Sequence, residues 1–486
     1  MKSAINILWF KRDLRLKDHL PFKTAIEDDL PILLIYILEP SLISAQYSDE
    51  RHWRFIVESI KDLNEQLKRY SQQVYMFYCE AIPLFEKLLS YYEIKNVFSH
   101  RETGTWLTYQ RDIEVNKFFK ARGIKWKEFQ SNAVIRGLKN RDSWNEKRNV
   151  YLSMPLANPQ LEKLKPFNIE NEIFIFFNPQ NFISSLNSNQ QMQKGGEKEA
   201  EKVLNSFLKE RHVGYIKNIS LPEQSRIHCS RLSPYLAWGN LSIRQVEQLT
   251  NKLLKKTSSK RDLLAFQSRV AWHCHFIQKL ETEPEYEFRN INSAFDHIRT
   301  EWNETHYQAW KDGLTGYPLI DACMRCVKET GYINFRMRAM LVSFLTHHLW
   351  LDWKEGANFL AKQFLDFEPG IHFPQFQMQA GTTGINTIRI YNPTKQALEH
   401  DNNAVFIKRW VPELATLPSS LAIEPWKITP FEEVSYNFIY GKNYPKRIVD
   451  TEITYRRANK ILWQIKKSTA SRIESEKILD KHVKSV

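Results

Sequence analysis

The sequence has few cysteines, and no export signal precedes its first charged segment. Five cysteines are scattered along 486 residues without the spacing of a disulfide framework. The opening stretch MKSAINILWFKRDLR becomes charged after one short apolar run, unlike a secretory signal. A secreted, disulfide-stabilised protein is therefore excluded, and we expect a reducing, cytoplasmic environment.

The sequence also lacks long apolar runs and glycine-rich phosphate-binding motifs. Its densest apolar stretch, LPILLIYIL at residues 30–38, has only the length of a strand. No GxGxxG or GxxxxGK[ST] pattern follows the first apolar run. We therefore expect no membrane span, and neither a dinucleotide-binding fold nor a P-loop is indicated.

Basic and aromatic residues are abundant. The chain carries 69 Lys and Arg against 55 Asp and Glu, a net charge of +14, with 14 Trp and 13 % aromatic residues. Such a charge favours a polyanionic partner, although a soluble basic enzyme would also show it. So many rings need large buried surfaces or a stacked ligand.

Length and periodicity predict two domains, because one core seldom extends beyond about 250–300 residues. Residues 1–133 alternate strand-length apolar runs with amphipathic stretches, which predicts an α/β domain with a parallel sheet covered by helices on both faces. Residues 134–204 lose this period and are expected to form an interdomain linker. Residues 205–470 show helical periods almost throughout, and 471–486 are expected to be a charged C-terminal tail.

Two constellations could bind an anionic or ring-shaped ligand. The segment CSRLSPYLAWGNLS begins at Cys229 and leads into a short helix, a pattern typical of a phosphate cradle but also of an ordinary helix cap. Arg336 and Arg338 precede Asp366 and Glu368 by some 30 residues. These charges could form a plain interhelix ion pair or flank a bound ring system.

The Cys and His pairs do not have the spacing of a metal site. Cys323 and Cys326 lie inside one helical pattern without a second pair. His273 and His275 face different sides of their helix, and adjacent His347 and His348 meet the same objection. We therefore expect no metal site.

Several long motifs occur in one order along nearly the whole chain. They are WFKRDLRLKD at 9–18, SRLSPYLAWGNLS at 230–242, DGLTGYPLIDACMR at 312–325, TGYINFRMRAMLVSFL at 330–345, RIYNPTKQ at 389–396 and FIKRWVPEL at 406–414. Together they resemble the photolyase and cryptochrome flavoproteins.

The resemblance implies an N-terminal antenna domain, a helical domain that binds FAD, and light-driven electron transfer from reduced flavin to a flipped pyrimidine dimer in UV-damaged DNA. A monomeric deoxyribodipyrimidine photolyase is the expected protein. The cofactor-binding residues that it implies are Tyr215, Ser230, Leu232, Ser233, Asn334, Arg338, Asp366, Glu368 and His372.

The substrate positions depart from the family pattern. Trp272 matches the tryptophan that stacks on the lesion, but Arg269 stands where cyclobutane-dimer photolyases have a glutamate. An Arg cannot accept the hydrogen bonds that a carboxylate accepts. Phe335 and Ala339 replace an asparagine and a methionine, and they also stand where (6-4) photolyases have paired histidines. We expect Arg269, Trp272, Phe335, Ala339 and Gln396 to contact the lesion or its backbone.

The flavin surroundings differ as well. His372 takes the place of an asparagine beside flavin N5, where we expect it to tune the cofactor or simply to replace the amide as a hydrogen-bond donor. Phe376 replaces the innermost tryptophan of the electron-transfer chain, while Trp353 and Trp302 match its middle and outer members. Tyr332 or Trp350 is a candidate detour for electrons.

Two matters stay open. Leu107 and Thr108 replace the Asn-Glu pair of folate-binding members, so a second antenna chromophore is of unknown identity. The altered substrate positions favour a cryptochrome-type blue-light photoreceptor as the alternative function. The basic charge and the absence of a long C-terminal extension favour repair.

Overall fold

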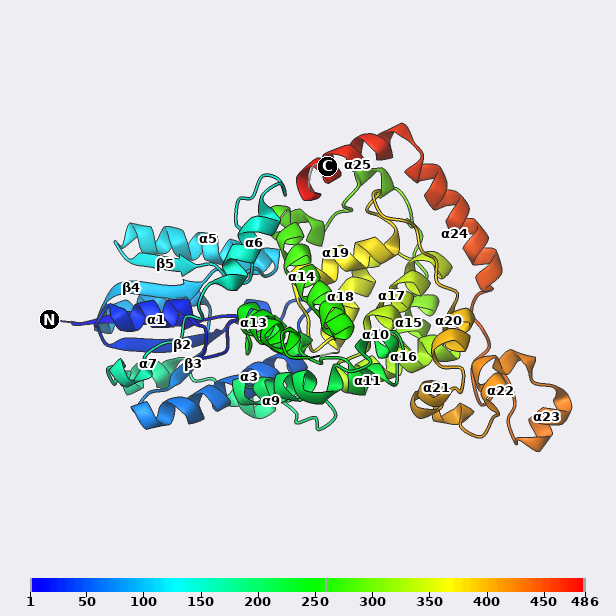
Figure 1. Cartoon of the computed structure of the whole chain (residues 1–486), viewed down its shortest axis with the longest axis horizontal. Coiled ribbons are helices and arrows are strands. Elements are labelled where there is room, and N and C mark those ends of the chain that lie inside the picture. The colour runs from blue at the N-terminus through cyan, green and yellow to red at the C-terminus, as the bar shows by residue number, and fades with distance from the viewer. Residues whose placement is uncertain (1, 258–259, 484–486) are drawn as a thin grey trace.

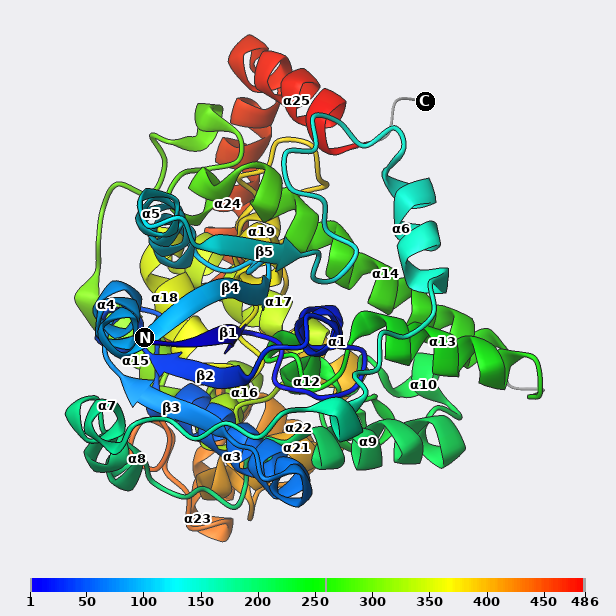
Figure 2. The same cartoon turned by 90° about the vertical axis from the view of Figure 1, so that its left-hand side faces the viewer.

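A parallel sheet of five strands forms the centre of the N-terminal domain of this computed structural model, which describes residues 2–257 and 260–483 (Figure 2). The strands are β1 (Ser3–Phe10), β2 (Ile32–Leu38), β3 (Val74–Tyr78), β4 (Tyr92–His100) and β5 (Lys125–Phe129), in the order β3-β2-β1-β4-β5. In β1, Asn6 pairs with Ile32 of β2 and Ser3 with Tyr92 of β4. The predicted α/β domain is thereby confirmed.

Helices cover both faces of this sheet, and the side-chain alternation of β1 decides what each face meets. Leu8 and Phe10 pack with α1 (Leu20–Glu27) and α3 (Glu50–Leu67), while Ile7 and Trp9 pack with the opposite helices. Those are α4 (Ala81–Tyr91) and α5 (Trp106–Ala121); the short α2 (Pro40–Ile43) follows β2. Burial on both faces explains the nearly continuous apolar sequence of the central strands.

The second domain is almost wholly helical, as predicted (Figure 1). Its helices are α10 (Tyr215–Asn218), α11 (Ser225–His228), α12 (Ser233–Ala237), α13 (Ile243–Leu254), α14 (Lys260–Thr282), α15 (Glu304–Asp312), α16 (Pro318–Thr330), α17 (Phe335–Ser343), α18 (Trp353–Gln363), α19 (Pro369–Ala380), α20 (Pro393–His400), α21 (Val405–Trp410), α22 (Ser419–Ile423), α23 (Pro430–Ser435), α24 (Thr451–Lys466) and α25 (Thr469–His482). A π-helical turn, Phe344–His348, follows α17.

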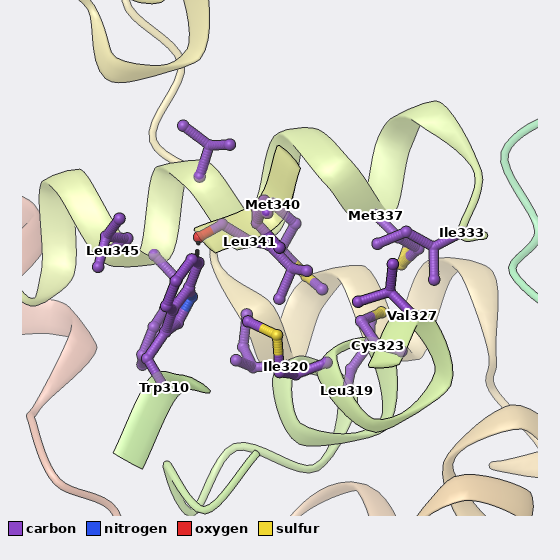
Figure 3. Close-up of a cluster of buried hydrophobic side chains, with 14 of the residues drawn as sticks. Trp310, Leu319, Ile320, Cys323, Val327, Ile333, Met337, Met340, Leu341 and Leu345 are labelled. Atoms are coloured by element: carbon purple, nitrogen blue, oxygen red, sulfur yellow. Dashed lines mark hydrogen bonds between the residues drawn. The ribbon is translucent and has the colours of Figure 1, made fainter. Parts of the chain in front are cut away.

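The core of this domain is packed around Trp310 of α15. Its ring is fully buried beside Leu341 and Leu345, and Nε1 donates to the carbonyl oxygen of Leu341 at 3.2 Å (Figure 3). Apolar side chains of α16 and α17 fill the rest of the cluster. The buried indole therefore has its polar atom satisfied, as a tryptophan in a core requires.

The two segments expected to be irregular are largely ordered. Residues 134–204 contain α6 (Trp144–Ser153), α7 (Asn171–Phe176), α8 (Gln180–Ser185) and the start of α9 (Glu197–Ser206). Ile173 enters the core of the first domain, and Glu197 accepts the backbone N–H groups of Leu16 and Lys17. These local contacts leave no simple period in the sequence.

The tail predicted for residues 471–486 needs correction, because most of its described part is helix α25. Ile478 and His482 are buried, and His482 pairs with Glu283 at the end of α14. The charged residues misled the prediction, because the helix buries only a few side chains, Ser471, Ile478 and His482.

Among the helices of the described ranges, none has the length and apolar character that a membrane span requires.

The turn after β1 joins the two domains. Arg12 donates to the carbonyl oxygens of Ala237 and Phe367, and Arg15 donates to that of Gly239. Gly239 has φ +74°, and a Cβ there would lie 2.2 Å from the carbonyl oxygen of Arg12. Only glycine fits this close approach.

A buried ion pair completes the junction. Arg244 of α13 donates to both carboxylate oxygens of Asp18, whose side chain is 1 % exposed. Burial alone would raise the pKa of Asp18, but attraction to Arg15, a hydrogen bond from Ser242 and attraction to Arg244 lower it. The carboxylate is therefore charged and needs its partners.

Replacing Arg244 by Met should lower the free energy of unfolding by about 3–5 kcal/mol, because it leaves the Asp18 charge buried without its partner. Urea unfolding followed by circular dichroism measures the effect. Arg456→Met is the matched control: Arg456 and Glu452 lie 3.9 Å apart with side chains 81 % exposed, so the change should stay below about 0.5 kcal/mol. Equal losses of unfolding free energy in the two variants would show that the Asp18–Arg244 pair does not stabilise the domain junction.

Candidate functional site

Arg338 and Asp366 form a two-point ion pair in the helical domain, in which Asp366 is buried and Arg338 is partly buried. Nη1 and Nη2 of Arg338 lie 3.0 and 2.8 Å from the two oxygens of Asp366, and Nε donates to the carbonyl oxygen of Ile333. The guanidinium also lies 4.0 Å from the ring centroid of Phe364. Burial would raise the pKa of Asp366, but attraction to Arg338 lowers it. The pair is thus charged and fixed in orientation.

Ser233, the first residue of α12, meets this pair. Its side chain hydrogen-bonds Asp366 and is otherwise exposed. Asn334, just before α17, is 3 % exposed, and its Oδ1 has no partner within the described chain. A buried amide oxygen without a partner indicates that a ligand atom or water completes its hydrogen bonding.

A residue of the interdomain segment also reaches the site. Gln193 accepts from Nη2 of Arg231 at 2.9 Å and donates to the backbone oxygen of that residue. The guanidinium of Arg231 lies 3.6 Å from the ring centroid of Tyr332. The sequence carries no signal for Gln193, because its neighbours are polar and lack a period.

Of the other predicted cofactor residues, Tyr215 and Leu232 are buried, and the backbone oxygen of Ser230 accepts from Arg211. Glu368 lies just before α19. It caps α19 by accepting the N–H of Gly370 and faces Arg12 at 3.6 Å across the domain junction. Burial raises the pKa of Glu368 to about 7, although Arg12 opposes this.

His372 is held in one tautomer. Its Nε2 donates to the backbone oxygen of Ala357 at 2.8 Å, since a carbonyl can only accept. Burial lowers the pKa of His372 to about 4, so the ring is neutral at pH 7 and its Nδ1 carries a lone pair. The prediction that His372 supplies a donor in place of an amide therefore fits poorly, because the free nitrogen is an acceptor.

The predicted substrate residues divide into exposed and buried ones. Trp272 and Phe335 are 43 % and 44 % exposed, and the guanidinium of Arg269 lies 4.2 Å from the Trp272 ring centroid. Ala339 and Gln396 are buried instead. The predicted contact of Ala339 with DNA needs correction, because its methyl group is buried. Gln396 keeps one unpartnered oxygen among the described residues.

Aromatic side chains lead from His372 toward the protein surface, with one step that passes through backbone instead of a ring contact. The ring centroid of Phe376 lies 5.5 Å from that of His372 and 6.4 Å from that of Trp353. Two residues beyond Trp353, the backbone oxygen of Glu355 accepts from Tyr307, whose ring lies 4.7 Å from exposed Trp302. The sequence analysis missed Tyr307, because only the fold brings α15 against α18.

The two proposed detours lie near cations. Tyr332 lies under the guanidinium of Arg231, apart from the Trp353 chain. Trp350 has the guanidinium groups of Arg299 and Arg457 at 5.0 and 5.2 Å from its ring centroid. A nearby positive charge disfavours removal of an electron from a ring. Neither residue therefore suits electron donation as well as Trp353 does.

A cavity lies at the carboxyl edge of the sheet. The side chains that line it include the rings of Trp9, Tyr47, Trp53 and Trp238 and the charged groups of Lys11, Arg12, Glu39, Glu102 and Arg111. Burial raises the pKa of Glu39 to about 7, against the opposing attraction of Arg111. This edge, where the strand order reverses beside β1, is where open α/β sheets bind ligands.

One buried group of possible metal ligands joins Asp13 and His19, which follow β1, to His100 at the end of β4. Nδ1 of His19 accepts the N–H of Phe22, so Nε2 bears the proton and faces Asp13 at 3.1 Å. Nδ1 of His100 lies 2.7 Å from the same carboxylate oxygen. Burial would raise the pKa of Asp13, but attraction to His19 and hydrogen bonds from both rings hold it well below its ordinary value. The lone pair of His19 Nδ1 is thus engaged, and the hydrogen bonds to Asp13 support the turn.

Comparison with known proteins identifies the fold. Residues 266–464 match the family model "FAD binding domain of DNA photolyase", and residues 6–140 match "DNA photolyase". A deoxyribodipyrimidine photo-lyase of Alkalihalophilus pseudofirmus is 26 % identical over 92 % of this chain and 95 % of its own length. A cryptochrome DASH of Gloeobacter violaceus is 25 % identical over 93 % and 94 %.

Among solved structures, a class III photolyase from Agrobacterium tumefaciens superposes with a TM-score of 0.82 and 24 % identity, covering 96 % of this chain and 99 % of that one. The chain belongs to the photolyase and cryptochrome family, and its helical domain is an FAD-binding domain. The charged pair, the exposed Ser233 hydroxyl and the unpartnered oxygen of Asn334 fit that cofactor.

Asp366→Asn should raise the dissociation constant of FAD by tenfold or more, because Arg338 would lose its charged partner in a buried place. The ratio of flavin to protein absorbance after dialysis, and titration of the apoprotein with FAD, measure this effect. Asp312→Asn is the control, since Asp312 forms an exposed pair with Lys328 at 3.5 Å. Unchanged FAD affinity in Asp366→Asn would show that the pair only supports the fold.

Proposed function

We propose that this protein is a light-dependent DNA repair enzyme, a deoxyribodipyrimidine photolyase acting as a monomer in the cytoplasm on UV-damaged DNA. The observation that carries the proposal is the exposed pair of Trp272 and Arg269 on helix α14, which packs against α19, the helix that contains His372. Bound FAD, once reduced, supplies an electron donor that light can excite. The chain's own residues must bring a lesion to it.

Trp272 offers an open indole face on which a flipped base can stack. Such stacking contributes about 1–3 kcal/mol per base. Arg269 lies against the same ring and supplies N–H donors where related enzymes have an acceptor, so it suits a base carbonyl or a backbone phosphate. The net charge of +14 supports attraction to the DNA backbone.

His372 would present an unprotonated Nδ1 toward the cofactor. Because its proton is committed to the backbone oxygen of Ala357, this nitrogen can accept a hydrogen bond but cannot donate one. We infer that His372 favours those states of the flavin that carry a proton at the facing atom. This preference would support the reduced, repair-competent cofactor.

We infer that the cavity at the carboxyl edge of the sheet holds the second chromophore. Its aromatic lining offers faces for stacking, and its charged side chains offer polar contacts to a ligand. The identity of that chromophore stays open, as in the sequence analysis.

The test is blue-light repair of oligonucleotides that carry one cyclobutane dimer or one (6-4) lesion. Using enzyme with chemically pre-reduced FAD and dark controls separates repair from the supply of electrons. We expect light-dependent restoration of one lesion. Failure with both lesions, despite bound FAD, would contradict the proposal and favour a cryptochrome-type photoreceptor, as the altered residues Arg269, Phe335 and His372 would then suggest.

Arg269→Ala refines this test. It should weaken binding of damaged DNA about tenfold, while binding of undamaged DNA changes less, because one directed contact to the lesion is lost. Arg261→Ala removes the same charge from an exposed position on the same helix and serves as the control. Equal weakening on damaged and undamaged DNA would reduce Arg269 to a phosphate contact.

We also infer an electron path from Trp302 through Tyr307 and Trp353 to the flavin, with Phe376 as a gap. Trp353→Phe should slow the light-driven reduction of FAD at least tenfold, because it widens that gap, yet leave repair by pre-reduced enzyme unchanged. Bleaching of the flavin absorbance with an external reductant measures the rate. Trp350→Phe is the control and should leave the rate unchanged; a loss in this variant instead would place the path beside Arg299.

A further inference from the structure

Four basic side chains from three separate segments meet at the upper edge of the helical domain. Arg141 lies in the loop before α6, His275 and Lys279 lie on α14, and His482 is the last residue of α25. Figures 1 and 2 both show the end of α25 beside this loop and beside α14. The four groups perturb one another electrostatically, since Arg141 lowers the pKa of each of the other three.

Arg141 is buried with most of its hydrogen-bonding capacity unused. It is 4 % exposed, and Nη2 donates to the backbone oxygen of His275 at 3.1 Å. Nε and Nη1 have no partner among the described residues. The guanidinium lies 4.9 Å from the ring centroid of Trp144, a contact that returns only part of the cost of removing it from water.

Lys279 is the second buried cation. It is 6 % exposed and forms no ion pair with any residue that the structure describes. It follows His275 by four residues, so the two side chains share one face of α14. Burial, with repulsion from Arg141, lowers the pKa of Lys279 to about 8, so the ammonium is still charged at pH 7.

The acid near these cations is already engaged. Glu283 accepts from Nε2 of His482 at 2.6 Å and from Nζ of Lys481 at 2.9 Å. Attraction to Glu283 raises the pKa of Lys279 less than burial lowers it. Arg141 therefore has buried donors without a partner among the described residues, and beside it Lys279 carries a second positive charge that no described acid pairs with directly. Such an arrangement is costly unless something compensates it.

We propose that Arg141 and Lys279 bind a small inorganic anion that joins the interdomain segment and α25 to α14. The burial of both side chains excludes a phosphate of the DNA backbone, because a duplex cannot reach them. The same helix carries Arg269 and Trp272 in its preceding turns, so the anion would stabilise the helix that presents the proposed substrate residues.

His482 couples this site to pH. Its Nε2 is committed to Glu283, so in the neutral ring its unpartnered Nδ1 is a lone pair that repels an anion. Lys279, Arg141, Glu283, Tyr286 and Lys481 surround this ring, and burial lowers its pKa. Protonation at Nδ1 adds a donor, and the bound anion stabilises that charge. Anion binding should therefore be tighter at pH 6 than at pH 8.

Thermal unfolding of the FAD-loaded protein tests the proposal. In chloride or phosphate, compared with gluconate at equal ionic strength, the Tm should rise by about 2 °C or more, and more at pH 6 than at pH 8. Arg141→Gln and Lys279→Met should abolish this difference. Lys477→Met, which removes an exposed charge of α25 that pairs with Glu474, should keep it. The same anion-dependent rise in all variants would overturn the proposal.

Crystals of the unaltered protein grown in bromide provide a second measurement that does not depend on the variants folding. An anomalous scattering peak within hydrogen-bonding distance of Arg141 and Lys279 would support the site. Bromide peaks elsewhere, with none between these two side chains, would overturn it. Growth in phosphate distinguishes a site that accepts an oxyanion from one that holds only a halide.

Discussion

The packing of the turn after β1 against residues 237–240 is the contact on which the rest of the molecule depends. Arg12 and Arg15 donate to backbone oxygens of this stretch, and Asp18 pairs with Arg244 inside the junction. Backbone groups buried between two domains need such partners. The stretch follows α12 directly, so the same contacts fix Ser233 and, through the bond from Arg12 to Phe367, the backbone beside Asp366. The same contacts therefore determine both how the two domains dock and where the residues of the cofactor site lie.

The interior of the site, around Arg338 and Asp366, differs in character from its entrance, around Arg269 and Trp272. Inside, the Arg338–Asp366 pair and Ser233 form a charged, hydrogen-bonded group within the range that matches the FAD-binding domain or just before it. At the entrance, Arg269 lies against the Trp272 ring, where it presents donors and positive charge. A cofactor of constant chemistry demands a constant interior, whereas the entrance can be rebuilt around the partner that it binds. The features that distinguish this protein therefore lie at the entrance to the site, around Arg269 and Trp272.

Sequence reasoning succeeded where local pattern and motif decide the structure. The period of residues 1–133 predicted the sheet, and long motifs predicted the Arg338–Asp366 pair. It failed where distant segments meet. Gln193 reaches Arg231 from a segment without a period, and Tyr307 approaches Glu355 only because α15 packs on α18. The charged stretch that forms α25 likewise shows no pattern from which the burial of Ser471, Ile478 and His482 could be predicted. Tertiary contacts of this kind produce no regular spacing of residues in the sequence from which they could be predicted.

The central claim is that the rebuilt entrance still brings a lesion to the flavin. The excited-state lifetime of pre-reduced FAD, measured with and without oligonucleotides bearing a cyclobutane dimer or a (6-4) lesion, tests it most directly. Electron transfer to a bound lesion opens a new route of decay, so the account predicts a shorter lifetime with one lesion and no change with undamaged DNA of the same sequence. An unchanged lifetime with both lesions, at concentrations where the DNA is bound, would contradict it.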